Sequence, residues 1–212
     1  MITNQTRSIY LASRSPRRRD LLSQIGVRFQ MLLFRSQPEA HVDVNEDVLP
    51  DEAPAAYVER LARAKAELGW QRIVQRNLPR YPVLGADTTV AVGGRILGKP
   101  ASRGEAAEML AALSGRKHEV LTAIALKSEE RIECRVSRTE VEFRTVAGDE
   151  IREYVATGEA DDKAGGYAIQ GRAAQFVIAL HGSYSGVMGL PLYETAQLLE
   201  KFSATRERRH SH

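Results

Sequence analysis

The alternation of short apolar runs with helical segments is the feature that most limits what this chain can fold into. Runs typical of strands occupy 9–13, 29–34, 83–92, 118–127, 131–144 and 176–180, and segments typical of helices occupy 16–25, 55–68, 102–113, 149–157 and 191–202. Strands that alternate with helices build mixed or parallel sheets covered by helices. The pattern therefore predicts an α/β or α+β fold with a mixed sheet.

Two helix starts can be placed from their capping residues. Ser15 precedes Pro16, and a serine cap followed by proline is a typical first turn, which Gly26 would match at the other end. Ser102 is followed three residues later by Glu105, which is the pattern of a capping box. The first of these signals puts a helix N-terminus directly after an apolar strand.

The composition is that of a globular chain without a membrane span. Apolar residues make up 43% of the 212 residues, and no apolar stretch approaches the ~20 residues that a span requires. The N-terminus carries no apolar signal segment, and the single cysteine, Cys134, allows no internal disulfide. We therefore expect a soluble cytoplasmic protein with no membrane partner.

The net charge of +3 comes from the C-terminus. Residues 201–212 carry four basic residues and one acid, so the first 200 residues hold 26 charges of each sign. We expect one domain over 1–202 and a basic, disordered tail over 203–212. No nucleic-acid partner is expected from this charge distribution.

A basic turn follows the first predicted strand. Ser13, Arg17 and Arg18 offer hydroxyl and guanidinium donors at a helix N-terminus, where free N–H groups and the helix dipole favour an anion. Arginine also matches the geometry of phosphate. Cations at this end of a helix oppose its dipole, an arrangement that is favourable when an anion lies between them. The alternative is a solvated basic turn.

Asp87 lies in the middle of an apolar strand, which Gly85-Ala86-Asp87 is expected to interrupt. A carboxylate in such a position is costly unless it is paired or bound to a metal. The small Gly85 and Ala86 leave room for a ligand. Asp87 is therefore a candidate to hold a divalent metal and to orient or deprotonate a water. An edge-strand aspartate that faces solvent is the alternative.

Two lysines are candidate phosphate contacts. Lys99 stands between Gly98 and Pro100, but Pro100 occupies the position where a P-loop needs a hydroxyl, so a P-loop NTPase is excluded. Lys65 follows an apolar stripe on its predicted helix and is a candidate to point inward. For both, a solvated surface lysine is the alternative.

The glycine-rich loop at 162–171 contains Tyr167 and Gln170. Glycines allow a backbone to approach a ligand closely. A tyrosine ring can stack on a base, and an amide both donates and accepts hydrogen bonds. The loop therefore has the groups needed to read a base edge, although a long surface loop is the alternative.

Several ordered motifs resemble one known family. They are Leu11-Ala12-Ser13-x-Ser15-Pro16-Arg17-Arg18, Gly85-Ala86-Asp87-Thr88, Gly98-Lys99-Pro100, Leu113-Ser114-Gly115, Asp162-Lys163-Ala164-Gly165-x-Tyr167-x-Ile169-Gln170-Gly171 and Gly189-Leu190-Pro191-Leu192. In these motifs, which run from about Ile9 to Phe202, the chain resembles the Maf family of nucleoside triphosphate pyrophosphatases.

The resemblance implies a fold like that of the inosine triphosphatases, an elongated mixed sheet flanked by helices in two lobes around a cleft. It also implies metal-dependent hydrolysis between the α- and β-phosphates of a nucleotide, with Mg²⁺ or Mn²⁺ as cofactor. A homodimer is common in the family.

The resemblance further implies roles for individual residues. Asp87 matches the catalytic acid–base residue and, with Glu39, the metal site. The other matching positions are catalytic or phosphate-binding Lys65 and Lys99, phosphate-binding Ser13 and Arg18, and Arg17, Thr88 and Gln170, which set the preference for dTTP and UTP. Lys163 and Tyr167 of the glycine-rich loop are further candidate substrate-binding residues. Gln170 would pair with N3–H and O4 of uracil, and a donor-only Arg17 near O4 would exclude cytosine.

The sequence departs from the family pattern at two places, and it is compatible with three functions. Arg14 stands where the family usually has a small residue, and the segment 36–54 is longer and more acidic than expected, which puts the match of Glu39 in question. A dTTP/UTP pyrophosphatase is the leading reading. The alternatives are a pyrophosphatase for another nucleotide, such as 7-methyl-GTP, and a non-catalytic nucleotide-binding regulator of cell division.

Overall fold

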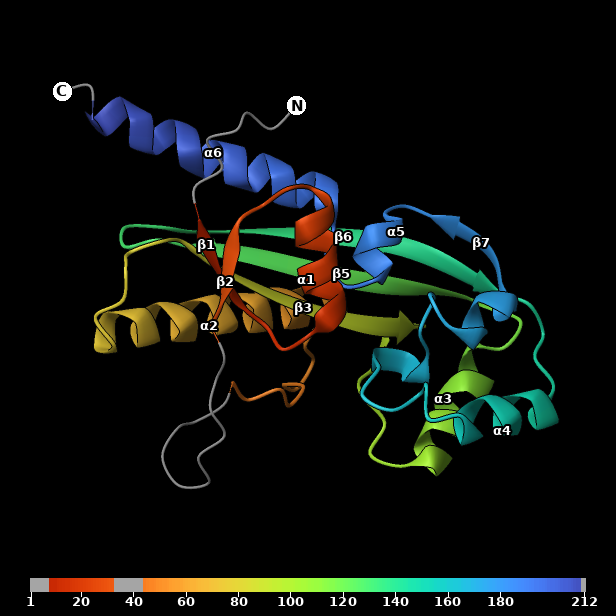
Figure 1. The fold of residues 1–212 in the computed structure, drawn as a ribbon. Helices are drawn as coiled ribbons and strands as arrows, with labels where there is room; N and C mark the ends of the chain where they lie inside the picture. The colour runs from red at the N-terminus through yellow and green to blue at the C-terminus, as the bar shows by residue number, and fades with distance from the viewer. Residues whose placement is uncertain (1–7, 33–43, 211–212) are drawn as a thin grey trace.

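The computed structural model describes residues 8–32 and 44–210, and its centre is one mixed sheet (Figure 1). The strands are β1 (Ile9–Ala12), β2 (Phe29–Met31), β3 (Val83–Val92), β4 (Arg95–Leu97), β5 (Lys117–Lys127), β6 (Ile132–Phe143) and β7 (Val177–His181). They are ordered β2-β1-β3-β5-β6-β7, with β4 paired to β3. Strands β2, β1 and β3 run parallel and the remaining pairs are antiparallel, which confirms the predicted mixed sheet.

Helices cover the sheet on both faces. They are α1 (Pro16–Gln24), α2 (Pro54–Gln75), α3 (Arg103–Leu113), α4 (Gly148–Ala156), α5 (Tyr184–Val187) and α6 (Leu192–His210), with 3₁₀ turns η1 (Ala164–Gly166) and η2 (Arg172–Phe176). Helices α1 and α6 lie on the face opposite α2, and α3 and α4 lie at the far end of β5 and β6 (Figure 1). None of these helices is both long and apolar enough to cross a bilayer in the described part of the chain.

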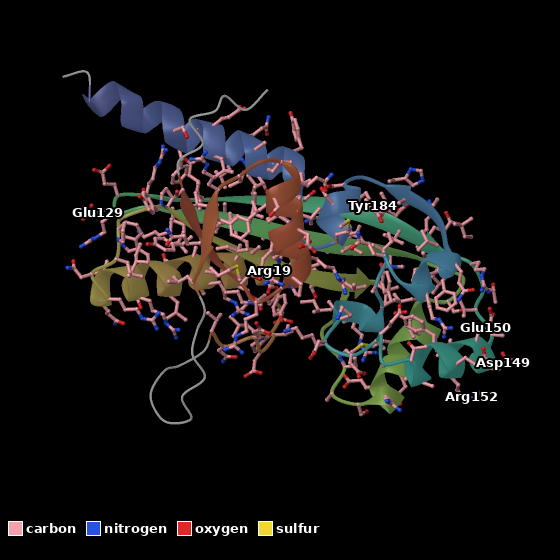
Figure 2. The ribbon with its side chains drawn as sticks, in the orientation of Figure 1. Arg19, Glu129, Asp149, Glu150, Arg152 and Tyr184 are labelled. Atoms are coloured by element: carbon pink, nitrogen blue, oxygen red, sulfur yellow. The ribbon has the colours of Figure 1, made fainter. Side chains whose placement is uncertain are left out.

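Separate apolar clusters occupy these layers. One joins α1, α6 and the sheet through residues such as Leu22, Leu84 and Leu198, and another packs α2 on β5. A third lies at the far end, where Phe143 and Phe176 pack with α3 and α4. Asp149 and Glu150 occupy the first turn of α4 at this end, where the helix dipole favours negative charge (Figure 2).

Strand β3 has the predicted bounds, but Gly85-Ala86-Asp87 does not interrupt it. The predicted room for a ligand at Gly85 is also wrong. A Cβ on Gly85 would meet the backbone of Ala62 and Ala66, because α2 packs directly on β3 at this point. Gly85 therefore allows α2 to pack closely on β3. This close packing places Lys65, which α2 carries, beside Asp87.

Two helices are longer than predicted. Helix α2 continues past Leu68 to Gln75 and includes Gly69. A Cβ on Gly69 would meet the Val83 side chain, so this glycine allows α2 to pack closely on β3. Helix α6 begins after Pro191 but runs past Phe202 to His210, in a segment without glycine or proline to end it. The division into a domain at 1–202 with two lobes and a tail at 203–212 stays a prediction.

The other predicted features are largely present. Ser102 accepts a hydrogen bond from the Glu105 amide and begins α3, and Gly26 follows α1 with a φ of 71°. Ser15 stands at the cap position of α1, but its side chain makes no capping bond. The backbone N–H of Ser15 instead donates to Ser13 Oγ at 3.2 Å, so the turn is closed by Ser13.

Candidate active site

A short opening in the sheet positions a pocket. Strand β1 pairs with β3 as far as Ala12 and Gly85, and β4 pairs with β3 from Val90 onward. Between these pairings β3 is an edge strand on that side in the described residues, and β1 ends beside it at the start of α1. Ligands of parallel sheets bind beyond the carboxyl ends of strands, and this opening has that position.

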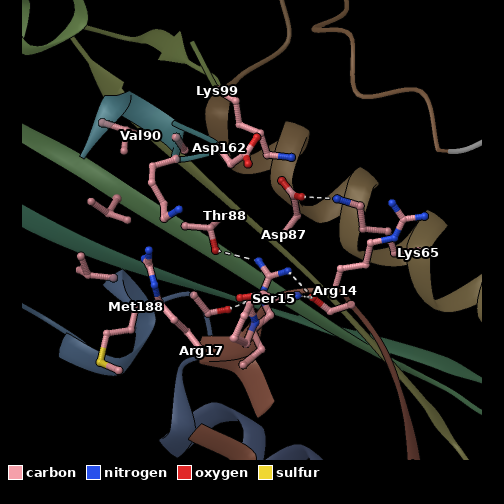
Figure 3. Close-up of a pocket in the computed structure, with 18 of the residues that line it drawn as sticks. Arg14, Ser15, Arg17, Lys65, Asp87, Thr88, Val90, Lys99, Asp162 and Met188 are labelled. Carbon is pink, nitrogen blue, oxygen red and sulfur yellow. Dashed lines mark hydrogen bonds and ion pairs between the residues drawn. The ribbon is translucent and has the colours of Figure 1, made fainter. Parts of the chain in front are cut away.

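The pocket at this opening has a volume of about 850 Å³ and receives side chains from both faces of the sheet (Figure 3). Neighbouring strand residues point to opposite faces, so Asp87 faces α2 while Thr88 faces α1 and α5. Both line the pocket because no neighbouring strand covers this part of β3. The other predicted site residues along the wall are Ser13, Arg17, Arg18, Lys65, Lys99, Lys163 and Tyr167.

An ion-pair cluster occupies the α2 face. The Nζ of Lys65 lies 2.6 Å from Asp87 Oδ1 and 2.6 Å from Glu46 Oε1. Lys99 Nζ lies 3.4 Å from the other oxygen of Glu46. Burial alone would raise the pKa of Glu46, but the hydrogen bonds and charges of Lys65 and Lys99 outweigh burial and lower it. Lys65 therefore points inward, as the sequence indicates, and holds two carboxylates beside the opening.

Glu46 is a site residue that the sequence analysis missed. Tyr57 Oη donates to the backbone carbonyl of Glu46 at 2.9 Å, and Arg60 donates to the carbonyls of Asn45 and Asp47 on either side of it. These contacts from α2 fix the loop that carries Glu46. No local signal distinguishes Glu46 from the other acids of 36–54, so only the fold could have revealed it.

A hydrogen-bonded cluster occupies the other face and centres on Arg18. Its Nε donates to the Gly189 carbonyl at 2.7 Å, Nη1 to Ser13 Oγ at 3.1 Å and Nη2 to Thr88 Oγ1 at 3.1 Å. Burial lowers the pKa of Arg18, and the charges of Asp87 and Glu46 oppose that effect. A guanidinium has five N–H donors, so two remain for a ligand in the pocket.

Ser13 completes this cluster as a donor. Its Oγ accepts from Arg18 Nη1 and from the backbone N–H of Ser15, which fills both accepting positions of the hydroxyl. The O–H of Ser13 is therefore left to donate toward a ligand. An oxygen that can only donate to its ligand suits a phosphate.

More cations line the pocket around these two clusters. Arg17 and Lys163 contribute to the wall, in addition to Lys99 of the ion-pair cluster. Burial and the nearby charge of Arg17 lower the pKa of Lys163, and Asp161 and Asp162 oppose this effect. Lysines and arginines gathered in one cavity repel each other, and an anion between them relieves that repulsion.

One wall is apolar. Val90 and Val120 are directly paired across β3 and β5, on the same face as Thr88, and Val187 and Met188 stand near them in the wall. Gly165 packs against Val90 with its φ of 69°, so the glycine-rich loop approaches a strand and not a ligand at this point. The pocket therefore combines a charged side, in which cations outnumber carboxylates, with an apolar side.

The structure separates the two predicted base-reading residues. Tyr167 lines the pocket, but its ring is buried against Phe143, and its Oη lies 2.9 Å from Nε2 of His118. Gln170 is exposed and, among the described residues, lies outside the pocket wall. The sequence motif that contains both residues does not indicate that one is buried and the other exposed, because their exposure depends on how the loop folds.

Two carboxylate side chains at the site are suitable ligands for a divalent cation. Mg²⁺ typically uses one or two carboxylates together with phosphate oxygens and water, and Asp87 and Glu46 supply the carboxylates. The Lys65 ammonium already stands between them as a cation. Glu39, predicted for this role, lies outside the described residues. Within 8–32 and 44–210 there is no group of three or more His, Cys, Asp or Glu side chains that could hold a metal.

Two other residues with possible chemical roles, Arg63 beside Lys65 on α2 and the single cysteine Cys134, do not line the pocket. Arg63 forms an ion pair with Glu59 one helical turn before it on α2. Burial raises the pKa of the Cys134 thiol to about 11, which leaves it protonated at neutral pH and a poor nucleophile. Neither residue is part of the site.

The fold and pocket together define a class. This is an α/β protein with a cleft at the end of a parallel strand, and the cleft has both donors for an anion and an apolar wall. A nucleotide has these two parts, and the cleft is of the nucleotide-binding kind.

Comparison with known proteins identifies the family within this class. The model of the family described as "Maf-like protein" matches residues 8–202, and the chain belongs to this family. A dTTP/UTP pyrophosphatase of Nitrosomonas europaea is 56% identical over 95% of this chain and 97% of its own length. A dTTP/UTP pyrophosphatase of Aromatoleum aromaticum is 57% identical over 92% of this chain and 95% of its own. The Staphylococcus aureus Ham1 structure covers 80% of this chain and 91% of its own, with a TM-score of 0.45 and 15% identity.

Proposed function

We propose that this protein is a nucleoside triphosphate pyrophosphatase that hydrolyses dTTP and UTP to the monophosphate and pyrophosphate. The observation that carries the proposal is the pocket at the β3 opening, where Asp87 stands among Lys65, Lys99 and Arg18. Relatives with this activity in their names are more than half identical over nearly the whole chain. Cytoplasmic location and a homodimer stay predictions.

The reaction adds water to the α-phosphorus and breaks its bond to the oxygen that bridges to the β-phosphorus. Asp87 takes the proton of the attacking water, and pyrophosphate leaves with the bridging oxygen. Phosphoryl transfer depends mainly on positioning and on neutralising charge. Arg18, Lys99 and the Ser13 hydroxyl hold the phosphate oxygens, and Lys65 fixes the carboxylate of Asp87.

A divalent cation, Mg²⁺ or Mn²⁺, fits the carboxylates of Asp87 and Glu46. When bound it would neutralise phosphate charge and make the attacking water more acidic. Because Lys65 contacts both carboxylates, it and the metal would share them, and Lys65 would keep the two oxygens close together before the metal arrives.

The test is hydrolysis of the canonical nucleoside triphosphates and 7-methyl-GTP with Mg²⁺ or Mn²⁺, with pyrophosphate measured separately from phosphate. We expect pyrophosphate mainly from dTTP and UTP, and its loss in Asp87→Asn. The matched control is Asp20→Asn, which removes the same charge from an exposed position on α1 and should leave turnover unchanged.

Other outcomes would identify the alternatives. Pyrophosphate released chiefly from 7-methyl-GTP would indicate the other substrate. Binding without turnover in the folded protein with metal present would indicate a regulator that only binds nucleotide.

A further inference from the structure

The hydrogen bonds of Thr88 can be assigned a direction. Thr122 Oγ1 lies 2.7 Å from the Gly186 carbonyl and 2.9 Å from Thr88 Oγ1. A carbonyl can only accept, so the one proton of Thr122 goes to Gly186. Thr122 must then accept from Thr88, which commits the proton of Thr88 to Thr122.

The same reasoning applies to the other side of Thr88. Arg18 Nη2 lies 3.1 Å from Thr88 Oγ1, and a guanidinium can only donate. Donation therefore runs one way, from Arg18 to Thr88, then to Thr122 and to the Gly186 carbonyl. One accepting position remains on the Thr88 oxygen, which lines the pocket.

This direction decides what Thr88 can contact. Phosphate oxygens at neutral pH accept hydrogen bonds, so an oxygen that can only accept is unsuitable beside them. The hydroxyl of Ser13, which belongs to the same hydrogen-bonded cluster, has the opposite role. Its two accepting positions are filled, so its O–H is left to donate to a ligand. The phosphates therefore belong at Ser13, and a group with an N–H or O–H belongs at Thr88.

The surroundings of Thr88 favour the base over the sugar as the source of that donor. Val90 and Val120 form the next row on the same face, and Val187 and Met188 line the wall beside it. An apolar surface of this kind covers a planar ring. Uracil and thymine carry a proton on N3, whereas the N3 of cytosine is an acceptor and would face the acceptor on Thr88.

We propose that Thr122 is a positioning residue that fixes Thr88 as an acceptor and thereby selects bases with a protonated N3. The inference rests on the proposed function, because it concerns the same pocket. Thr122 is buried and is not part of the pocket wall, so it would act on a ligand only through Thr88. Gln170 is exposed and does not contribute to the pocket wall, so the chain of donation through Thr88 is formed without it.

The test compares Thr122→Val with Thr122→Ser. Valine keeps the shape but removes the acceptor, so the Thr88 hydroxyl can turn and donate to cytosine. One hydrogen bond corresponds to about a tenfold change in an equilibrium constant, so we expect the UTP:CTP ratio of kcat/KM to fall about tenfold in Thr122→Val. Thr122→Ser retains the hydroxyl and should keep the ratio.

A matched control is available on the neighbouring residue of β3. Thr89 is buried, and its hydroxyl has no hydrogen-bond partner among the described residues. Thr89→Val therefore removes a buried threonine hydroxyl outside the chain of donation and should leave the ratio unchanged. Thermal unfolding of each variant shows whether it is folded.

Nucleotide affinities separate this inference from the proposed function. The dissociation constants of UTP, CTP, 3-methyl-UTP and 3′-deoxy-UTP are measured in metal-free buffer, where hydrolysis is not required. We expect UTP to bind more tightly than CTP and 3-methyl-UTP, and Thr122→Val to lose this preference. Equal or unmeasurable affinity for UTP and CTP in the wild type, or an unchanged preference in Thr122→Val, would overturn the inference. Weakening confined to 3′-deoxy-UTP would assign the donor to the ribose and also overturn it.

Discussion

The two faces of β3 contribute side chains to the same pocket, but ion pairs hold the side chains on one face and hydrogen bonds hold those on the other. On the α2 face, Lys65 joins Asp87 and Glu46 through ion pairs, and Lys99 reaches Glu46 from the partly exposed rim. On the opposite face, Arg18 and Thr88 are held by hydrogen bonds that end on backbone carbonyls. The first set can exchange partners when a ligand arrives, and the second set is fixed in place and in direction.

This difference suits the two tasks of the proposed enzyme. A reacting centre must pass a proton and accept new charge, and ion pairs between long side chains can rearrange without breaking the fold. Recognition of a base needs donors and acceptors that stay where they are, which hydrogen bonds to the backbone provide. The predictions below test whether chemistry and recognition can be altered separately.

The largest effect is expected for Asp87→Asn. Loss of a general acid–base group typically lowers turnover by 10²–10⁴-fold, and we expect kcat for UTP to fall about 10³-fold. Because Thr88 and Thr122 are untouched, the affinity ratio between UTP and CTP should remain. Steady-state kinetics and equilibrium binding measure the two quantities. Selectivity lost together with turnover would show that the two faces do not act separately.

The second prediction concerns the pH dependence of stability that His118 should cause. His118 lies on the same side of β5 as Val120 and Thr122, and therefore on the Thr88 face of the sheet. Burial lowers the pKa of His118 from 6.5 to about 4, against the opposing effect of the Arg116 backbone. As the pH falls, His118 therefore takes up a proton at a higher pH in the unfolded chain than in the folded protein. Stability from this residue is complete above about pH 6.5 and should decrease by about 3 kcal/mol as the pH falls to about 4.

Urea unfolding across this pH range measures that loss. His118→Gln retains a polar partner for Tyr167 but does not titrate in this range, so its stability should depend less on pH. A variant as acid-sensitive as the wild type would assign the loss to carboxylates.

A smaller effect is expected for Arg18→Lys. Lysine keeps the charge but lacks the planar fork that joins Ser13, Thr88 and Gly189. Hydrogen bonds of charged groups contribute about 1.5–3 kcal/mol, so the unfolding free energy should fall by about 2 kcal/mol. Arg19→Lys, at the exposed next position of α1, is the control (Figure 2). Equal losses in the two variants would contradict the role given to Arg18.

The smallest effect on stability is expected for Glu46→Gln. The Glu46 side chain is 42% exposed, and ion pairs open to solvent contribute about 0.5 kcal/mol. Chemical unfolding should therefore show only a slight change, while the metal concentration needed for half-maximal turnover rises. A stability loss as large as that of Arg18→Lys would remove the distinction between the two faces.

The sequence predicts the elements of this site better than their contacts. The apolar run of β3 defines the bounds of that strand, and a lone carboxylate in it requires either a charged partner or a metal. The structure supplies the partner, Lys65, and the metal role stays a prediction. The apolar stripe before Lys65 indicates that this lysine points inward. Glu46 and Thr122 gave no such signal, because an acid in an acidic segment and a threonine in a strand are both ordinary. Their roles come from partners that are distant in the sequence.

The opening beside β3 has a consequence for how copies of this chain meet one another. An uncovered strand edge is a place where a strand of another molecule can add by backbone hydrogen bonds. Here the edge is short, and the charged residues that line the pocket beside it are six cations and three carboxylates. An identical copy that approaches this edge brings the same positive charges and is repelled, whereas a small anion is attracted. We therefore expect the positive charge that attracts a phosphate also to oppose aggregation through this edge.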